Sequence, residues 1–206
     1  SGVIHKGVSV KANIHVVFLT SESQRSITNV KDENDVNIRF FESLRAKDIL
    51  QYSSVTYFDL TERGLGEENT QEELKKKLFR LLYAQHFDLV FVPNSKDVHP
   101  DHQAAAKASE EMLAFIRRQY DKSMHQQIFY YEIWGALSTT NYIPLSQAAM
   151  NMKHRAMTCY ESQNATLEYA EVIQTINELR LDQFSQSFDN TVARPSGIEC
   201  YEAVQV

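Results

Sequence analysis

The residues of this chain best suited to chemistry lie together in the stretch from Asn94 to His102, which reads Asn-Ser-Lys-Asp-Val-His-Pro-Asp-His. His99 and His102 are three residues apart, so on the first turn of a helix both imidazoles can point into the same space. Asp101 between them can orient one ring or take part in proton transfer. Neutral imidazole binds Zn²⁺ and a second histidine can act as an acid, so the pattern suits metal-assisted hydrolysis. Two histidines are too few for a zinc site, and a polar loop whose histidines cap a helix explains the spacing equally well.

The elements on either side of this stretch predict where it lies in the fold. Residues 89–92 form a short apolar run, which predicts a buried strand. Pro100 fits the first turn of a helix, and we expect that helix to continue to about Arg118. In an open α/β sheet, ligands bind at the carboxyl ends of the strands. We therefore predict that residues 89–92 form a central parallel strand, with His99 and His102 at its carboxyl end.

Strands and helices are expected to alternate along the rest of the chain. Apolar runs predict strands at residues 14–19, 55–60 and 128–133, and amphipathic spacing predicts helices at 36–50, from 70, at 146–160 and at 167–184. The helix near residue 70 would open with a capping box from Thr70 to Glu73. This alternation favours parallel β-α-β units with helices on both faces of the sheet, a three-layer α/β/α arrangement. No Gly- or Pro-rich linker interrupts it, so we predict a single domain over residues 1–206.

The composition excludes several classes of protein. The chain has 21 Lys and Arg against 27 Asp and Glu, for a formal charge of −6, and it has no basic cluster for binding nucleic acid. No apolar run approaches the roughly 20 residues of a transmembrane helix. The first residues show no signal peptide, and Cys159 and Cys200 are expected to be reduced. We therefore expect a cytoplasmic globular protein without a nucleic-acid partner or a transmembrane segment.

Several short motifs follow one another in a characteristic order around residues 98–102. They are a glycine and a strand near the start, an Arg-x-x-Glu helix, an aromatic strand, a Lys-to-Ser-Gln helix and a closing Glu-Ala element. In chain order they lie at residues 1–2 and 16–20, 39–45, 131–134, 153–163 and 201–203. In this combination the chain resembles the LmbE-like, or PIG-L, family of zinc-dependent de-N-acetylases, which act on N-acetylglucosamine-bearing substrates. The resemblance implies the Rossmann-like fold of that family, with a mainly parallel sheet.

The resemblance also implies roles for the residues of the histidine stretch. His102 would be a zinc ligand, His99 would stabilise an oxyanion or protonate the leaving amine, and Asp101 would hold His99. The family's first motif, His-Pro-Asp-Asp, supplies two further ligands and the general base, on a first strand that would lie just ahead of Ser1. Neither that motif nor that strand is in this sequence. We therefore expect Zn²⁺ not to bind tightly to this chain alone, and the open sheet edge makes a homo-oligomer possible.

Three further residues are candidates for binding the amino-sugar substrate. By the resemblance, Tyr131 and Trp134 belong to the strand that walls the pocket, where their rings could stack on a sugar face. Arg39 could reach an anionic part of the substrate. The alternatives are that the aromatic residues belong to the core and that Arg39 forms ion pairs with Glu42 and Asp48 along its helix.

Two functions of different classes stay open at this point. The first is a zinc-dependent N-deacetylase, an amide hydrolase that removes the acetyl group of an N-acetylglucosamine-type amino sugar or conjugate. The second is a non-catalytic sugar-binding or interaction domain that has lost the metal motif. The presence of His99, Asp101 and His102 together favours the enzyme, because an idle site has no physical need for that combination.

Overall fold

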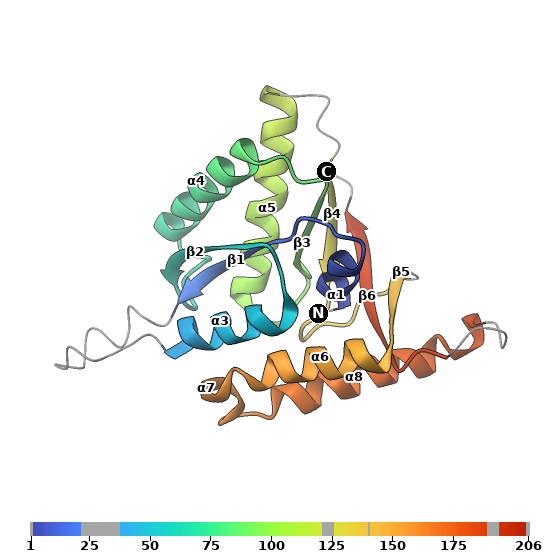
Figure 1. Ribbon diagram of the computed structural model, residues 1–206. Helices are drawn as coiled ribbons and strands as arrows, with labels where there is room; N and C mark the ends of the chain where they lie inside the picture. The colour runs from blue at the N-terminus through green and yellow to red at the C-terminus, as the bar shows by residue number, and fades with distance from the viewer. Residues whose placement is uncertain (1, 22–37, 121–125, 140, 189–193, 205–206) are drawn as a thin grey trace. The chain divides into compact units, whose positions relative to one another are not determined.

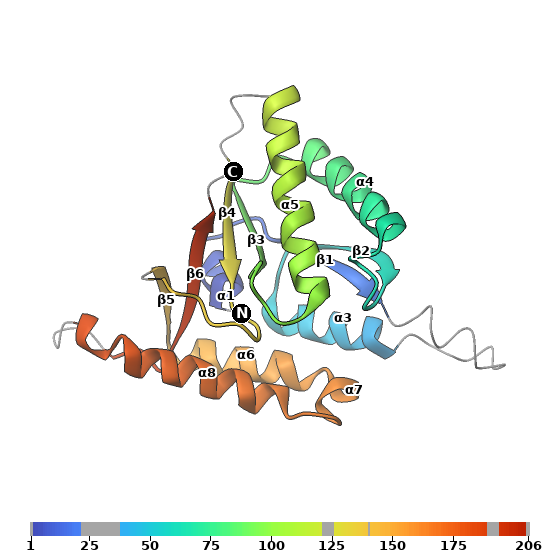
Figure 2. The same ribbon diagram turned by 180° about the vertical axis from the view of Figure 1, so that it is seen from behind.

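The computed structural model describes residues 2–21, 38–120, 126–139, 141–188 and 194–204 (Figures 1 and 2). The chain forms two compact units whose segments interleave in the sequence. The first comprises Ser1–Val17, Glu22–Thr56 and Tyr142–Glu199, and the second Phe18–Ser21, Tyr57–Asn141 and Cys200–Val206. Strands β1 (His15–Ser21), β2 (Ser54–Thr61) and β6 (Gly197–Val204) each begin in the first unit and end in the second. The single domain over residues 1–206 stays a prediction.

The first unit is mainly helical. It contains α1 (Gly2–Ser9), α3 (Ile38–Leu50), α6 (Gln147–Thr158), α7 (Glu161–Asn164), α8 (Tyr169–Gln183) and a 3-10 turn η1 (Ser185–Ser187). Helix α6 packs against α1, α3 and α8, and both views show α6 and α8 side by side (Figures 1 and 2). Strand β5 (Asn141–Leu145) leads into α6, and Leu145, Ala149 and Met150 bury an apolar cluster where the two elements meet. Ser146 caps α6, because its Oγ accepts the N–H of Ala149 at 3.2 Å.

The second unit combines two helices with a short sheet. Its elements are α4 (Glu68–Ala84), β3 (Leu89–Pro93), α5 (Pro100–Gln119) and β4 (Gln127–Tyr131), together with the last residues of β6. Helix α5 packs on both α4 and β3. Leu74, Leu78 and Leu82 form the buried stripe of α4, as helical spacing requires. Leu113 and Ile116 are the large buried residues of α5.

The expected alternation of strands and helices is confirmed, but the sheet differs from the expectation. Strand β3 pairs in parallel with β4, whereas β4 pairs antiparallel with β6, in a register that places Ile128 opposite Val204 and Tyr131 opposite Tyr201. Within the described residues β3 pairs with β4 alone, so it is not a central strand there. The sheet is mixed because the last strand of the chain, which the sequence did not predict, runs opposite to β4.

Two expected boundaries are also corrected. Helix α4 begins at Glu68, and its N-cap residue Glu67 makes no side-chain cap, so the capping box at Thr70 is wrong. The chain already turns at Gly64, whose carbonyl accepts the N–H of Glu67 at 3.0 Å, and this starts the helix two residues early. The strand expected at 128–133 ends at Tyr131.

Two other sequence expectations bear on the general class of the protein. None of the helices in the described ranges has the length and apolar content of a membrane span. Cys159 and Cys200 are both reduced, as expected from the sequence.

Candidate functional site

Buried polar groups hold the loop between β3 and α5. Asn94 is 2% exposed, and its backbone N–H donates to the carbonyl of Tyr131 on β4 at 3.1 Å. Its Oδ1 accepts the N–H of Lys96 at 2.9 Å, and its carbonyl accepts the N–H of Asp97 at 3.0 Å. This turn carries the chain from the sheet into the helix, and His99 becomes the N-cap residue of α5.

Asp97 is the buried centre of this loop, with 0% of the residue exposed. Its Oδ1 accepts the backbone N–H of His99 at 2.9 Å, and its Oδ2 accepts those of Trp134 and Gly135 at 2.9 and 3.2 Å. The ring Nδ1 of His102 lies 3.0 Å from Oδ1. Burial raises the pKa of Asp97, but these donors together outweigh burial and lower the pKa below its ordinary value. The carboxylate is therefore ionised at neutral pH.

The two imidazoles lie against each other at the start of α5. The ring centroids of His99 and His102 are 4.7 Å apart, with an angle of 32° between the ring planes. Nδ1 of His99 accepts the backbone N–H of Asp101 at 3.2 Å and thereby caps the helix. The His102 side chain is 23% exposed. The structure thus brings the two rings together after β3, as their spacing predicts.

The carboxylate of Asp101 contacts a neighbouring turn rather than the His99 ring. Its Oδ2 accepts the N–H of Arg63 at 2.6 Å, and its Oδ1 accepts that of Leu65 at 3.1 Å. Arg63 has a φ of 59°, a left-handed conformation that the carboxylate helps to hold. Asp101 contacts the His99 ring through its own backbone N–H, whereas the resemblance implied that the carboxylate of Asp101 would hold the ring.

Two of the three expected substrate-binding residues lie beside the same loop. Tyr131 ends β4, and burial, followed by the negative charge of Asp97, raises the pKa of its phenol to about 12. Trp134 is 38% exposed, and its backbone N–H donates to the carboxylate of Asp97. Arg39, the third candidate, lies on α3 in the other compact unit.

Asp97 is the site residue that the sequence reasoning did not single out. Its Oδ1 binds the N–H of the residue two positions ahead, which is the geometry of an Asx turn. An Asp two residues before an N-cap histidine, in a loop that follows an apolar strand, is the sequence signal that could have found it.

The described part of the chain does not form a zinc site by itself. Within it, no group of three or more His, Cys, Asp or Glu side chains could hold a metal ion. Nδ1 of His102 faces Asp97 and Nδ1 of His99 accepts the Asp101 N–H, so each ring keeps one nitrogen for other partners. A catalytic zinc has about three protein ligands. This donor set does not fit Zn²⁺.

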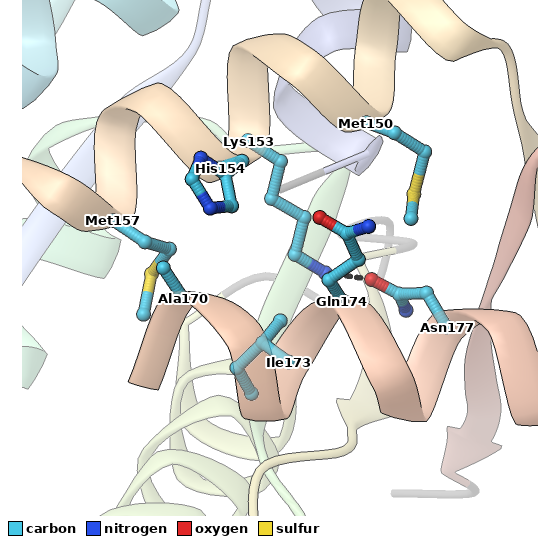
Figure 3. A pocket seen from close by; sticks show the side chains of 8 residues that line it. All are labelled: Met150, Lys153, His154, Met157, Ala170, Ile173, Gln174 and Asn177. Atoms are coloured by element: carbon cyan, nitrogen blue, oxygen red, sulfur yellow. Dashed lines mark hydrogen bonds between the residues drawn. The ribbon is translucent and has the colours of Figure 1, made fainter. Parts of the chain in front are cut away.

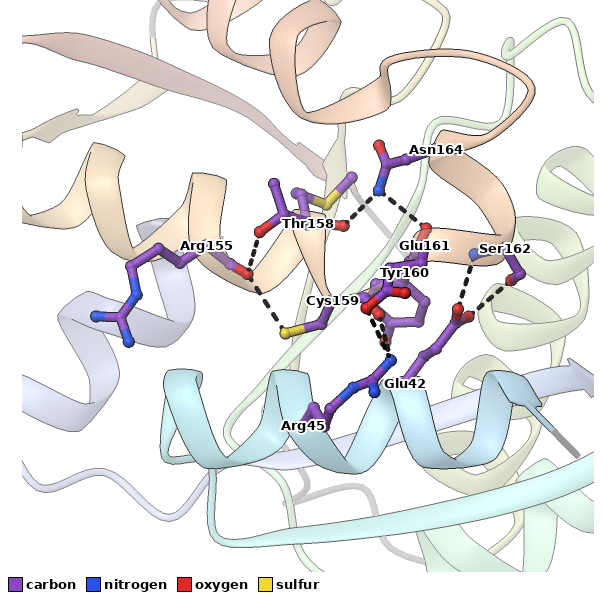
Figure 4. Close-up of polar contacts among 10 residues, drawn as sticks. Glu42, Arg45, Arg155, Thr158, Cys159, Tyr160, Glu161, Ser162 and Asn164 are labelled. Carbon is purple, nitrogen blue, oxygen red and sulfur yellow. Dashed lines mark hydrogen bonds and ion pairs between the residues drawn. The ribbon is translucent and has the colours of Figure 1, made fainter. Parts of the chain in front are cut away.

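In the first unit, the Arg-x-x-Glu motif joins α3 to the segment that follows α6 (Figure 4). Glu42 is 0% exposed, and its carboxylate accepts the backbone N–H and the Oγ–H of Ser162 at 2.8 and 2.7 Å. Arg45 donates to the carbonyl of Cys159 at 3.2 Å and lies 3.5 Å from the carboxylate of Glu161. These contacts connect two motifs of the resemblance, and they explain both as structural links between helices.

A second polar network in the same unit is centred on Lys153 of α6. Its Nζ donates to Asn177 of α8 at 2.7 Å (Figure 3). It also donates to Glu199 of β6 at 2.5 Å. The other oxygen of Glu199 accepts the N–H of Gly2 at 2.7 Å, and Asn177 donates to the carbonyl of Ile198 at 2.7 Å. The hollow that Figure 3 shows beside Lys153 has room for about one water molecule. The network therefore links α1, α6, α8 and β6 without enclosing a ligand-sized space.

Comparison with known proteins bears on the function of this site. The family described as PIG-L, GlcNAc-PI de-N-acetylase, matches residues 1–113. No curated protein matches the chain.

Several solved structures share the fold. A 4-carboxy-2-hydroxymuconate hydratase from Pseudomonas putida matches with a TM-score of 0.74 and 18% identity, over 100% of this chain and 89% of that chain. An N,N'-diacetylchitobiose deacetylase from Pyrococcus horikoshii has a TM-score of 0.73 and 16% identity, over 98% of this chain and 77% of that chain. A zinc-inhibited form of a teicoplanin deacetylase has a TM-score of 0.62 and 13% identity, over 98% of this chain and 92% of that chain. At these identities the likeness establishes the fold alone, and a hydratase shares that fold with the deacetylases.

Proposed function

This chain belongs to the PIG-L family of GlcNAc-PI de-N-acetylases, and from that premise we propose that it serves the hydrolytic removal of an acetyl group from an N-acetylglucosamine-type amino sugar or conjugate. The observation that carries the proposal is the pair of adjacent imidazoles, His99 and His102, each held by a different buried partner beside an aromatic wall.

In the proposed reaction, the oxygen of water adds to the acetamide carbonyl carbon, the C–N bond breaks, and acetate and a free amine leave. His99 is placed to act on the carbonyl oxygen or the leaving nitrogen. Its Nδ1 is used by the Asp101 N–H, so its Nε2 carries the proton that it can donate. A donor aimed at a developing oxyanion contributes a few kcal/mol to the rate of acyl transfer.

We assign His102 to the side of the site from which the nucleophilic water attacks. Of the zinc ligands in the family pattern, it is the one that this sequence contains. When bound, zinc supplies an activated water at neutral pH. The described residues do not form its site by themselves. Asp97 supports this assignment, since a ligating histidine characteristically directs its other ring nitrogen to a carboxylate.

The substrate would be bound by the residues around this pair. Trp134 is half exposed and Tyr131 carries a protonated phenol, so together they offer a ring face and a hydrogen-bond donor to a sugar. We assign Arg39 to an anionic group of the conjugate. The single domain expected over residues 1–206 belongs to the same proposal.

A second function is favoured by one observation, the lack of a three-ligand group within the described ranges. A sugar-binding or interaction domain needs the aromatic wall but not the metal. Such a domain would bind an N-acetylglucosamine conjugate and leave its amide intact.

The two functions are separated by measuring zinc content together with amine release from an N-acetylglucosaminide. We expect residues 1–206 to hold no stoichiometric zinc and to release no amine, and a version joined to a preceding His-Pro-Asp-Asp strand to gain both properties. In that extended version, His102→Ala should lose the metal. His99→Ala should keep the metal and lower turnover by about 10²- to 10⁴-fold, the usual contribution of a positioned acid. Tight zinc on residues 1–206, or full activity of His99→Ala, contradicts these assignments, and binding without hydrolysis in the extended version supports the second function.

A further inference from the structure

We propose that Asp97 is the positioning residue of this site, and that it fixes His102 in the tautomer protonated on Nδ1, opposite to that of the neighbouring His99, which is protonated on Nε2. The proposal deepens the proposed function and rests on it for its catalytic meaning. The tautomers themselves can be measured without any assay of activity.

The first argument is that the Asp97 carboxylate cannot reorient. It is fully buried, and three backbone N–H groups, those of His99, Trp134 and Gly135, donate to it at 2.9 to 3.2 Å. Because these donors lie on two separate segments of the chain, both oxygens are fixed in place. The carboxylate is therefore a rigid acceptor, not a mobile side chain that follows the histidine.

The second argument concerns the proton on His102. Its Nδ1 is shielded from solvent and has no well-aligned hydrogen-bond partner among the described residues, but it lies 3.0 Å from Oδ1 of Asp97. A bare nitrogen lone pair at that distance from a carboxylate oxygen would be repelled. The proton of the neutral ring therefore belongs on Nδ1, and Nε2 keeps its lone pair.

The third argument places the opposite tautomer on His99. Its Nδ1 accepts a backbone N–H from Asp101 at 3.2 Å, so this nitrogen holds the lone pair and the proton is on Nε2. The ring centroids are only 4.7 Å apart, and the pair thus presents one donor nitrogen and one acceptor nitrogen. Water attack on an amide uses both functions, an acceptor or ligand for the nucleophile and a donor for the oxyanion or the amine.

The same carboxylate also ties the histidine pair to the aromatic wall. Asp97 binds the N–H groups of Trp134 and Gly135, and Asn94 Nδ2 donates to the Gly135 carbonyl at 3.4 Å. A Cβ added at Gly135 would lie 3.3 Å from the Asp97 Cα, so the two segments approach closely. Trp134 is the single tryptophan of the chain and therefore reports on this contact.

The test is ¹⁵N NMR of the imidazole nitrogens at about pH 9, where ordinary histidines are neutral. In the wild-type chain we expect a protonated Nδ1 on His102 and a protonated Nε2 on His99. In Asp97→Asn, we expect His102 to lose its single tautomer and its Nε2 to gain proton occupancy. Acrylamide quenching of Trp134 should rise in the same variant, because one of the two carboxylate oxygens that hold the loop is replaced by an NH2 group, which cannot accept an N–H.

Asp101→Asn is the matched control, since it also alters a buried carboxylate that accepts two backbone N–H groups. It should leave the His102 tautomer and the quenching of Trp134 unchanged. A His102 protonated on Nε2 in the wild-type chain overturns the proposal, and that measurement requires no variant to fold. Equal spectral changes in both variants also overturn it, because they would mean general loosening of the loop. If the tautomers are as stated but the extended chain releases no amine, the proposed function fails and this inference stands.

Discussion

At the scale of single residues, two buried carboxylates close together in the sequence perform different tasks. Asp97 binds the turn after β4 and faces a histidine ring, whereas Asp101 binds the turn after β2. Residue type and spacing alone would allow either carboxylate to hold a histidine ring. The loop conformation set by Asn94 decides which carboxylate does so.

The pKa of Asp97 predicts how the stability of the protein depends on pH. Its folded-state pKa lies below the unfolded value of about 4, so the stability that it contributes is present above that pH and is lost as pH falls through the folded pKa. We expect Asp97→Asn to lower the free energy of unfolding by about 1–3 kcal/mol at pH 7. The loss should shrink as the pH falls through the folded-state pKa, because the wild-type carboxyl then takes up its proton. Urea unfolding at pH 7 and at a series of lower pH values tests this, and an equal loss at every pH would contradict it.

The same residues show how much of the site can be predicted from the sequence. The pairing of His99 with His102 was predictable, because it depends only on spacing at a helix start that Pro100 marks. The partner of each ring was not, because those partners depend on where Asp97 and the turn at Trp134 meet in three dimensions.

At the scale of elements, segments with a clear apolar pattern were predicted and segments without one were missed. Helix α5 and strand β3 have unambiguous patterns. Helix α1 was missed because its sequence, Gly-Val-Ile-His-Lys-Gly-Val-Ser, has two glycines and three β-branched residues, which favour a helix poorly. Its N-terminal N–H groups are instead satisfied by Glu199, a tertiary contact that no local pattern reveals.

The Lys153 network should make a large contribution to the packing of these elements. Lys153 and Glu199 are 14% and 11% exposed, and removing one partner of a buried ion pair costs about 3–5 kcal/mol. We expect Lys153→Met to destabilise the protein by about that amount. The double variant Lys153→Met/Glu199→Gln should recover part of the loss, because the amide oxygen can still accept the N–H of Gly2. A double-mutant cycle by urea unfolding measures the coupling, and additive losses would show that the pair contributes nothing beyond its separate residues.

Lys76→Met is the surface control, because the ion pair of Lys76 with Glu72 is exposed and should contribute less than about 1 kcal/mol to the free energy of unfolding.

At the scale of the whole molecule, neither compact unit is a continuous piece of chain. The second unit needs residues 200–204 to cover β4, which lies more than sixty residues earlier in the sequence. A fragment of residues 57–141 therefore has an open strand edge.

This arrangement predicts the behaviour of fragments. We expect residues 57–141 alone to aggregate or to lack a cooperative thermal transition. The same fragment joined by a flexible linker to residues 200–206 should be monomeric and should unfold cooperatively, because Val204 to Tyr201 can pair with Ile128 to Tyr131. Ala203→Pro in the joined version should abolish the gain, since proline cannot donate to the ladder. Sedimentation and circular dichroism check this, and a well-folded monomer of 57–141 alone would refute it.

The hydrogen bond between Gly2 and Glu199 has a consequence for how the protein is made. Its partners are 197 residues apart, and ribosomes add about 5–20 residues per second, so about 10–40 s separate their synthesis. A short, glycine-containing helix such as α1 is not stable in isolation. Helix α1 therefore lacks this stabilising contact, and stays accessible to chaperones and proteases, until β6 has left the ribosome.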